Sequence, residues 1–568
     1  MRLQATKRKK EAGLPLTEEH MTDRKMTVGR YLVRRLEQLD LKHAFGVPGD
    51  YVLTFLDLLE ESSIDLVNTC NELNAGYAAD GYARVSGLGA VCITYGVGGF
   101  SAYNAVAGAF AERIPLVVIS GGPKLSLRGR LHPNLLHHTI GDMNLQRDIF
   151  DRITQAAIVL RNPVQALRQI DETLAVCVRH SRPVYIEIPA DMVDEPCEEP
   201  GPWTPDRALH LDADVLAEAV EETLSLMSSA SSPVILAGVE VCRLNTQEAL
   251  LEVVERTGYP VATTALGKGV IPEHTNGYIG TYFGALANET TRRIVEASDL
   301  VLCLGAWTTD IDLGGYTAHL DPGRLIVANN ERVWVKRHVY DHVPLKDFLA
   351  ALCAALSTMA LPESRAALPL HPPSAPFVPS PQALLSADRF WARINRFIAD
   401  DHILVVDTGS SAFEGLKLCL PAGADYVSQC FYASIGFAIP ATLGIKLAAP
   451  RYRPIVFVGD GAFQMTGQEL STIIRRNLNP VIFLVNNDGY QVERVIYDNV
   501  YNDLQRWEYA LLPEAYGGKR GVAVRTEGDL EAVLRQAGEQ KDALVFADVR
   551  LKRDDFSETL RRLGETLR

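Results

Sequence analysis

The sequence has no long hydrophobic run, no excess of positive charge and no closely spaced pair of cysteines. No apolar stretch approaches the roughly 18 residues of a membrane span, so we expect no membrane partner. The formal net charge of −14 argues against nucleic acid as a partner. Nine cysteines occur singly without a C-x-x-C pattern, which is typical of a reducing compartment and unlike a disulfide framework or a zinc site. From these absences we expect a cytoplasmic protein that acts on a small molecule.

The length of the chain predicts more than one domain. At 568 residues it exceeds what one hydrophobic core supports, and one domain per roughly 150 to 200 residues gives about three. Residues 1–26 carry positive charge but lack the apolar segment of a secretory signal. We therefore expect these residues to form a disordered N-terminal extension.

Short apolar runs alternate with helical patterns along the rest of the chain. One alternation covers residues 27–193, and a second covers residues 208–360. Residues 361–382 are rich in proline and lack periodicity, which predicts a semi-rigid linker. Residues 383–568 form a third alternating segment, with a helix expected at the C-terminus. Strands that alternate with helices favour parallel sheets covered on both faces, so we expect an α/β fold of three doubly wound domains.

Polar residues follow two neighbouring strands of the third segment. The stretch "PIVFVGDGAF" places Asp460 between Gly459 and Gly461 after an apolar run, and "VIFLVNNDGY" places Asn487 after the next run. The "TGQE" between the two runs matches a capping box, which predicts a helix that begins near Thr466. A right-handed β-α-β crossover brings the carboxyl ends of both strands to one edge of the sheet. Asp460 and Asn487 should therefore converge.

These side chains have the chemistry of a magnesium site. A carboxylate, an amide oxygen and a free backbone carbonyl suit Mg²⁺ that keeps a phosphate group as a further ligand. The flanking glycines let a bulky anion approach the backbone closely. Each fragment alone is also compatible with an ordinary turn or strand end. Together, with about two dozen residues between them, they predict a magnesium diphosphate site.

This pairing of GDG with NN resembles the signature of the thiamine diphosphate-dependent 2-oxo acid decarboxylases, the group that includes pyruvate and indolepyruvate decarboxylases. The resemblance covers nearly the whole chain from Thr27 onward. It implies a pyrimidine-binding, a central Rossmann-like and a diphosphate-binding domain, in that order. It also implies thiamine diphosphate and Mg²⁺ as cofactors, with Asp460, Asn487 and the Gly489 carbonyl as metal ligands. The cofactor-binding set that it implies is Glu72, Ile435, Gly459, Asp460, Gly461, Ala462, Asn487 and Gly489.

The resemblance assigns two of these residues to the rings of the cofactor. Glu72 starts the alanine-rich stretch "ELNAGYAADGYARV" and would shuttle the proton that brings the aminopyrimidine to its reactive imino form, a task that suits a carboxyl group in an apolar site. Ile435 would wedge between the two rings and bend the cofactor. Ala433 stands where several members of the family carry glycine, and we expect this difference to matter little. Taken alone, Glu72 is also compatible with a helix-start acid, and Ile435 with a core residue.

Four further residues match the acid–base set of the same family: Asp50, His137, His138 and Glu493. Outside that context the histidines would be solvated loop residues, and Glu493 beside Arg494 would be a surface pair. The family reaction joins the cofactor ylide to a keto carbon, releases CO₂ to leave an enamine, and then needs proton transfers that suit histidine and a buried carboxyl group. The resemblance thus implies a lyase that converts a 2-oxo acid to an aldehyde. The alternative is a carboligase of the acetohydroxyacid synthase type, against which the complete acid–base set argues.

The resemblance also implies a homo-oligomer and a roomy substrate pocket. In the family the pyrimidine domain of one chain meets the diphosphate domain of its partner, so we expect a homodimer as the minimum and a homotetramer as the assembly. The stretch "GSSAF" places Ala412 where members restricted to pyruvate carry tryptophan and indolepyruvate enzymes carry alanine. We therefore expect aromatic, branched or six- to eight-carbon 2-oxo acids to be preferred over pyruvate. The apolar wall of this pocket is predicted to include Tyr282, Phe283, Phe556 and Leu560.

Overall fold

The computed structural model describes residues 25–128, 136–359 and 377–567. The chain divides into two compact units: unit 1 is Met1–Arg207 and unit 2 is Ala208–Arg568. The predicted N-terminal extension up to residue 24 and residues 361–376 of the predicted linker lie outside the described residues.

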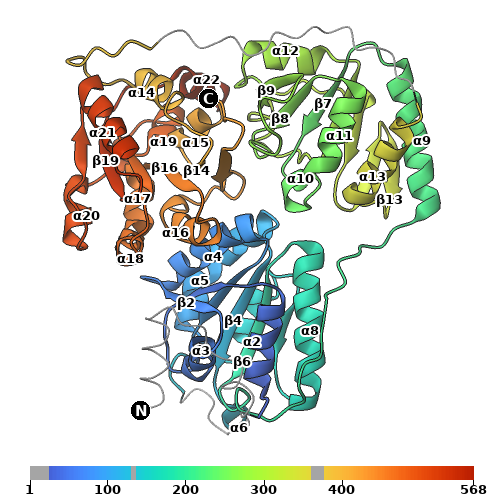
Figure 1. Cartoon of the computed structure of the whole chain (residues 1–568), viewed down its shortest axis with the longest axis vertical. Helices are drawn as coiled ribbons and strands as arrows, with labels where there is room; N and C mark the ends of the chain where they lie inside the picture. Colours follow the sequence, from blue (N-terminus) through green and yellow to red (C-terminus); the bar gives the residue numbers. More distant parts are fainter. Residues whose placement is uncertain (1–24, 129–135, 360–376, 568) are drawn as a thin grey trace. The chain divides into compact units, whose positions relative to one another are not determined.

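Unit 1 is built around a six-stranded sheet with the order β2-β1-β3-β4-β6-β5, in which all pairs are parallel. Helices flank this sheet (Figure 1). Five of its strands are the apolar runs that the sequence predicted, and the short β5 is an addition. The strands are β1 (His43–Gly46), β2 (Asp65–Asn68), β3 (Gly89–Ile93), β4 (Leu116–Gly122), β5 (Ala157–Val159) and β6 (Val184–Pro189).

Helices follow the strands of unit 1, and those that start at Val28, Glu72 and Pro163 begin at side-chain caps. The Asn71 side chain accepts a hydrogen bond from the Asn74 N–H at 2.8 Å and so caps the helix that starts at Glu72. This helix packs tightly on α5, since a Cβ added to Gly76 would lie 2.5 Å from the Ala105 Cβ. The helices are α2 (Val28–Gln38), α3 (Leu53–Glu60), α4 (Glu72–Ser86), α5 (Val97–Ala111), α6 (Leu125–Arg128), α7 (Leu145–Phe150) and α8 (Pro163–His180).

The first part of unit 2 contains a seven-stranded sheet with the order β13-β12-β11-β10-β7-β8-β9. Its pairs are parallel except for β11–β12 and β12–β13, which are antiparallel. The prediction of a mostly parallel sheet is confirmed, and the antiparallel edge is an addition. The strands are β7 (Pro233–Ala237), β8 (Val261–Thr264), β9 (Tyr278–Tyr282), β10 (Leu300–Leu304), β11 (Leu325–Ala328), β12 (Arg332–Val335) and β13 (His338–Asp341).

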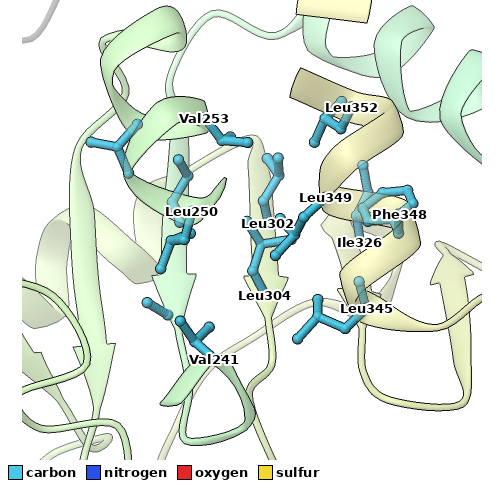
Figure 2. Packing of buried hydrophobic residues seen from close by; sticks show 14 of the residues in the cluster. Val241, Leu250, Val253, Leu302, Leu304, Ile326, Leu345, Phe348, Leu349 and Leu352 are labelled. Carbon is cyan, nitrogen blue, oxygen red and sulfur yellow. The ribbon is translucent and has the colours of Figure 1, made fainter. Parts of the chain in front are cut away.

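Helix α13 shows how the core of this sheet is covered. Leu345, Phe348, Leu349 and Leu352 recur at helical spacing, are fully buried and share one cluster with residues of the strands, Leu302 among them (Figure 2). The helices of this part are α9 (Ala213–Ser229), α10 (Glu240–Arg243), α11 (Gln247–Thr257), α12 (Glu289–Ala297), the 3₁₀ helix η3 (Pro322–Arg324) and α13 (Leu345–Leu356).

The second part of unit 2 contains a six-stranded sheet with the order β15-β14-β16-β17-β19-β18, all parallel. Numbered from its own first strand, this sheet has the same order as the sheet of unit 1. The strands are β14 (His402–Val406), β15 (Asp425–Ser428), β16 (Arg453–Gly459), β17 (Val481–Asn486), β18 (Val522–Val524) and β19 (Val545–Arg550).

The helix after β16 begins earlier than the sequence predicted. Helix α17 (Asp460–Thr466) starts directly at Asp460, so the capping box predicted at Thr466 is wrong. The Thr466 hydroxyl donates instead to the Gly436 carbonyl at 2.6 Å. The remaining helices are α14 (Ala387–Ile394), α15 (Ser410–Gly415), α16 (Ala438–Ala448), η4 (Gly467–Glu469), α18 (Leu470–Arg475), α19 (Gln491–Ile496), η5 (Val500–Asn502), η6 (Tyr509–Leu511), α20 (Leu512–Ala515), α21 (Glu527–Glu539) and α22 (Glu558–Leu567).

Among the described helices, none combines the length and the apolar character that crossing a bilayer would require. All nine cysteines are free thiols.

Candidate active site

The carboxyl ends of β14, β16 and β17 meet at one edge of the last sheet and border a cavity of about 360 Å³. Asp460 follows β16, and Asn487 follows β17, so the predicted convergence of these two residues is observed. The cavity is lined, among others, by Thr408, Gly409, Ser410, Ser411, Ala433, Ile435, Gly459, Asp460, Gly461, Ala462, Asn487, Gly489 and Glu493. Every cofactor residue predicted in unit 2 belongs to this lining.

Asp460 is held by backbone N–H groups from both loops. Its Oδ1 accepts from the Gly461 N–H at 2.9 Å, and its Oδ2 accepts from the Gly489 N–H at 3.0 Å. Burial raises the pKa of this carboxyl group to about 7, although the two N–H donors oppose the shift. A cation bound at this edge would therefore compensate the charge of the buried carboxylate.

The two asparagines after β17 have different environments. Asn486 donates through Nδ2 to the Asp548 Oδ1 at 2.8 Å and thus anchors the strand to β19. Asn487 is buried, and its Oδ1 has no hydrogen-bond partner among the described residues. Because an unpaired buried oxygen is costly, the Asn487 amide is suited to a ligand that the chain itself does not provide.

The turn that carries Ile435 is pinned from two sides. The buried Asp407, at the end of β14, accepts from the Gly436 N–H at 3.0 Å and from the Ala438 N–H at 2.8 Å. Thr466 binds the Gly436 carbonyl from the other side. Ala433 has a φ of +56°, in the left-handed region that favours glycine. A residue with a Cβ carries a cost of roughly 1 kcal/mol in this region.

Unit 1 carries the other predicted residues at the corresponding edge of its own sheet. Glu72 is the first residue of α4, and Gly98 of α5 leaves room beside it, since an added Cβ would lie 3.2 Å from the Glu72 Oε1. Asp50 follows β1, and its Oδ2 lies 2.5 Å from the His137 Nε2. His138 Nδ1 lies 3.9 Å from the other oxygen of Asp50. Asp50, His137 and His138 therefore form one cluster, as the resemblance implied.

Tyr51 orients this cluster. Its ring stacks on the His137 imidazole, with 4.9 Å between centroids and 10° between planes, and its hydroxyl donates to the His137 carbonyl at 3.2 Å. The neighbouring His138 adopts a φ of +65°. Its carbonyl passes so close to Gly96 that an added Cβ would lie 2.2 Å away. The histidine loop is thus held by local packing.

Three family models match the chain. They are the thiamine pyrophosphate enzyme N-terminal TPP binding domain over residues 26–147, the central domain over residues 220–356 and the C-terminal TPP binding domain over residues 407–549. The chain belongs to the thiamine pyrophosphate enzymes. Within that family, pyruvate decarboxylase 1 of Pisum sativum is 36% identical over 551 residues, covering 95% of this chain and 92% of the relative. Pyruvate decarboxylase 1 of Zea mays is 37% identical, covering 95% and 90%. A probable pyruvate decarboxylase of Schizosaccharomyces pombe is 34% identical, covering 95% and 96%.

These relatives place the chain among the thiamine diphosphate-dependent 2-oxo acid decarboxylases, as the sequence motifs predicted. The residues present in unit 2 fit the cofactor of this family. The unpaired Asn487 Oδ1 and the buried Asp460 suit a cation, and a Cβ added to Gly459 would meet no atom within 4 Å, so the backbone is open to an anion there. Ser411 adds a buried hydroxyl without a partner among the described residues.

The residues predicted for the substrate pocket do not line this cavity. Ala412 is buried on α15 between Ser411 and Phe413, and these two neighbours line the cavity instead. Tyr282, Phe283 and Leu560 are fully buried core residues, with Phe556 packed against their cluster. The Tyr282 hydroxyl is used in a hydrogen bond to Glu296. None of these five side chains is among the described lining residues.

The sequence did not predict six apolar residues of the lining, which are Leu286, Ile311, Phe413, Val492, Leu563 and Leu567. Two of these residues carried a signal, because Leu563 and Leu567 continue the helical spacing of the predicted Leu560 toward the C-terminus. Phe413 and Val492 each adjoin a residue that had been predicted. Leu286 and Ile311 lie in loops of the central part, and no motif marked them.

Proposed function

We propose that this protein decarboxylates a bulky aromatic, branched or long aliphatic 2-oxo acid to an aldehyde and CO₂ with thiamine diphosphate and Mg²⁺, in preference to pyruvate. The observation that carries the proposal is the convergence of Asp460, the unpaired Asn487 Oδ1 and Glu493 on one cavity with an apolar wall.

The metal and the diphosphate would be held by the loops after β16 and β17. Asp460, the Asn487 Oδ1 and the Gly489 carbonyl would bind Mg²⁺, which prefers such hard oxygen ligands and keeps phosphate oxygens as well. Gly459, Gly461 and Ala462 would let the diphosphate approach the backbone, while Ile435 would support the bend between the rings. When bound, thiamine diphosphate supplies a carbon nucleophile and an electron sink for the carbon–carbon bond that breaks.

The chain's own residues would hold and move protons. Glu72 would exchange a proton with the pyrimidine ring, and Gly98 places no side chain against its Oε1. Asp50 and His137 share a short hydrogen bond, so the pair can pass a proton to the reacting carbon or oxygen, with His138 next to it. Glu493 lines the cavity and would contact the carboxylate of the substrate.

The apolar lining supports the proposed substrate class. Leu286, Ile311 and Phe413 present no charge to the cavity, and Leu563 and Leu567 of α22 complete that wall. Ala412 lies between Ser411 and Phe413 of the lining, so a larger side chain there would change the shape of this wall. Each methylene of substrate buried there should contribute up to about 0.8 kcal/mol.

A panel of 2-oxo acids tests the proposal. Aldehyde release should give a higher kcat/KM for phenylpyruvate, indolepyruvate or a six- to eight-carbon acid than for pyruvate. Ala412→Trp should reverse this order, with both proteins measured at saturating cofactor. A wild-type enzyme that prefers pyruvate over every larger acid would contradict the substrate proposal and leave the decarboxylase proposal standing. Joined acids in place of aldehydes, or a yellow purified protein, would favour the carboligase alternative.

We also propose a homodimer as the minimum assembly, a homotetramer as the full one, and a cytoplasmic location. Each copy would contribute its pyrimidine-binding unit to the cofactor of its partner. Helix α5, which carries no charged residue and leaves Val97 56% exposed, is the surface of unit 1 that we propose for this contact. Sedimentation of the purified protein tests the assembly, and a monomer with full specific activity at nanomolar concentration would contradict it.

A further inference from the structure

The Arg494 side chain donates hydrogen bonds to the backbone of the loop that follows β17. This side chain is buried on α19, with 1% exposed. Nη1 donates to the Asn487 carbonyl at 2.9 Å, and Nη2 donates to the Asp488 carbonyl at 2.5 Å. One guanidinium group therefore fixes two successive peptide groups, a task for which its rigid fork of donors is suited.

The second of these peptide groups connects Arg494 to a predicted metal ligand. The Asp488 carbonyl accepts from Arg494, and the N–H at the other end of the same peptide bond, that of Gly489, donates to the Asp460 Oδ2 at 3.0 Å. Hydrogen bonds at both ends of a peptide group polarise and strengthen each other. The position of Asp460 against its neighbouring loop thus depends on Arg494.

The loop has a backbone that needs such support. Asp488 has a φ of +59° and Gly489 a φ of +152°, both outside the regions that most residues prefer. A Cβ added to Gly489 would lie 2.3 Å from the Arg494 Nη2 and 2.1 Å from the Asn502 carbonyl. Only glycine leaves space for the guanidinium group, so the two residues fit together as a pair.

The charge of Arg494 ties this loop to the next segment of the chain. Asp503 lies 2.9 Å from the Arg494 Nη2 and also pairs with Arg553 at 2.8 Å. The Tyr490 N–H donates to the Asn502 carbonyl at 2.9 Å. The loop that carries Asn487 and Gly489 is therefore joined to residues 502–503 by a backbone hydrogen bond and by an ion pair.

We propose that Arg494 is a positioning residue, which presets the Asn487–Gly489 loop for the magnesium diphosphate and slows release of the cofactor. This inference rests on the proposed function, because it concerns the cofactor site. Arg494 acts through the loop backbone and touches neither metal nor substrate.

The test compares cofactor binding in three variants of the full-length protein. Arg494→Met keeps an unbranched apolar side chain of similar length, and Arg494→Lys keeps the charge but offers a point donor in place of a fork. Arg506→Met is the matched control, because Arg506 binds the same loop only through the Asp488 side chain and is 79% exposed. Equilibrium dialysis of thiamine diphosphate against the cofactor-free protein over a Mg²⁺ series gives the dissociation constants, and dilution into chelator gives the release rates.

We expect Arg494→Met to weaken Mg²⁺-dependent binding roughly 10- to 100-fold, the usual effect of losing a group that orients metal ligands. Arg494→Lys should fall between this variant and wild type, and Arg506→Met should stay within about twofold of wild type, as an exposed pair would. Release rates should rise in the same order. At saturating Mg²⁺ and cofactor, the turnover of Arg494→Met should lie closer to the wild-type value than its cofactor affinity does.

Three outcomes would overturn the inference or its basis. Equal dissociation constants and release rates for wild type and Arg494→Met would refute the positioning role. A lower unfolding midpoint of the cofactor-free Arg494→Lys protein, with wild-type affinity in its folded fraction, would show a structural role only; this variant also decides the question if Arg494→Met does not fold. A wild-type protein that binds no thiamine diphosphate would instead refute the proposed function.

Discussion

At the scale of single residues, adjacent positions in the sequence have opposite roles. The pattern "VERV" suggests that Glu493 and Arg494 could form a surface pair, but α19 turns Glu493 toward the cavity and solvent and buries Arg494 behind the metal-site loop. Likewise, Asn486 pairs with Asp548 while Asn487 faces the cavity. Motif spacing could predict Asp460 and Asn487 because strand ends fix them. It could not predict Arg494, because the partners of that residue are backbone carbonyls, which every sequence has.

Replacement of Glu72 by Gln should slow the reaction roughly 10²- to 10⁴-fold, the range for losing a general acid–base group. An amide cannot shuttle the proton, whereas the fold and the Mg²⁺ site in unit 2 should stay intact. Steady-state turnover at saturating cofactor measures the effect, with Glu172→Gln on the exposed surface of α8 as the control. Full turnover in Glu72→Gln would remove the proposed role.

Asp312 gives a prediction for pH. This buried carboxyl group accepts from the Leu266 N–H at 2.9 Å, and burial raises its pKa to about 7. Because its pKa is about 3.9 when unfolded, the folded state binds the proton more tightly, and this group lowers the free energy of unfolding as pH rises from about 4 to about 7. The loss is up to about 4 kcal/mol.

Asp312→Asn should remove this loss. Denaturation midpoints of the variant should improve relative to wild type from pH 5 to pH 8, and the exposed Asp214→Asn should show no such trend. Parallel curves for Asp312→Asn and wild type across that range would show that the carboxyl group keeps its ordinary proton affinity in the folded protein.

At the scale of elements, apolar runs predicted the buried parallel strands well, since a strand covered on both faces is apolar throughout. The runs "PVILAG" and "LVLCLG" became β7 and β10. Strands β12 and β13 were missed because they lie at an antiparallel edge, where polar residues are tolerated. The predicted capping box does not form because the Thr466 hydroxyl donates instead to the Gly436 carbonyl.

The contact between α19 and α22 depends on Gly564. A Cβ added there would lie 2.7 Å from the Val495 carbonyl, so Gly564→Ala should push α22 outward and cost roughly 1 to 3 kcal/mol. Because Leu563 and Leu567 of α22 line the cavity, the KM for the 2-oxo acid should rise as well.

Gly538 on α21 is the matched control, since an added Cβ meets no atom within 4 Å there. Gly538→Ala should leave KM unchanged and stabilise by up to about 1 kcal/mol through helix propensity. Urea midpoints and KM values of the two variants test the direction of the expected change in stability and in KM. Equal effects of the two substitutions would mean that α22 does not pack on Val495 in solution.

At the scale of the whole molecule, the sequence predicted three α/β sheets, and the part of the chain that the structure describes contains three. Compactness nevertheless divides the chain into two units, because the second and third sheets share a core cluster and a cavity. Composition and periodicity indicate only that each sheet, taken by itself, is covered by helices. They carry no information on which covered sheets then pack together, since that depends on residues such as Leu286 and Leu563, which meet only in the folded chain.

Cofactor binding should stabilise the whole protein. At a thiamine diphosphate concentration 100 times the dissociation constant, with Mg²⁺ present, the expected gain is about 2.7 kcal/mol. Calorimetric scans should show a higher unfolding midpoint for wild type and for the exposed-surface variant Asp542→Ala, but not for Asp460→Ala, which lacks the metal ligand. A wild-type increase in Asp460→Ala would contradict the proposed metal site.

The division after Arg207 also matters while the chain is being made. Unit 1 is complete as soon as this residue leaves the ribosome, whereas the rest of the chain takes on the order of tens of seconds longer at roughly 5 to 20 residues per second. During that interval the nascent chain lacks its second unit, so it cannot yet form the proposed homodimer. An incomplete chain is open to aggregation, so we expect the yield of assembled enzyme to depend on how well chaperones protect unit 1 during synthesis.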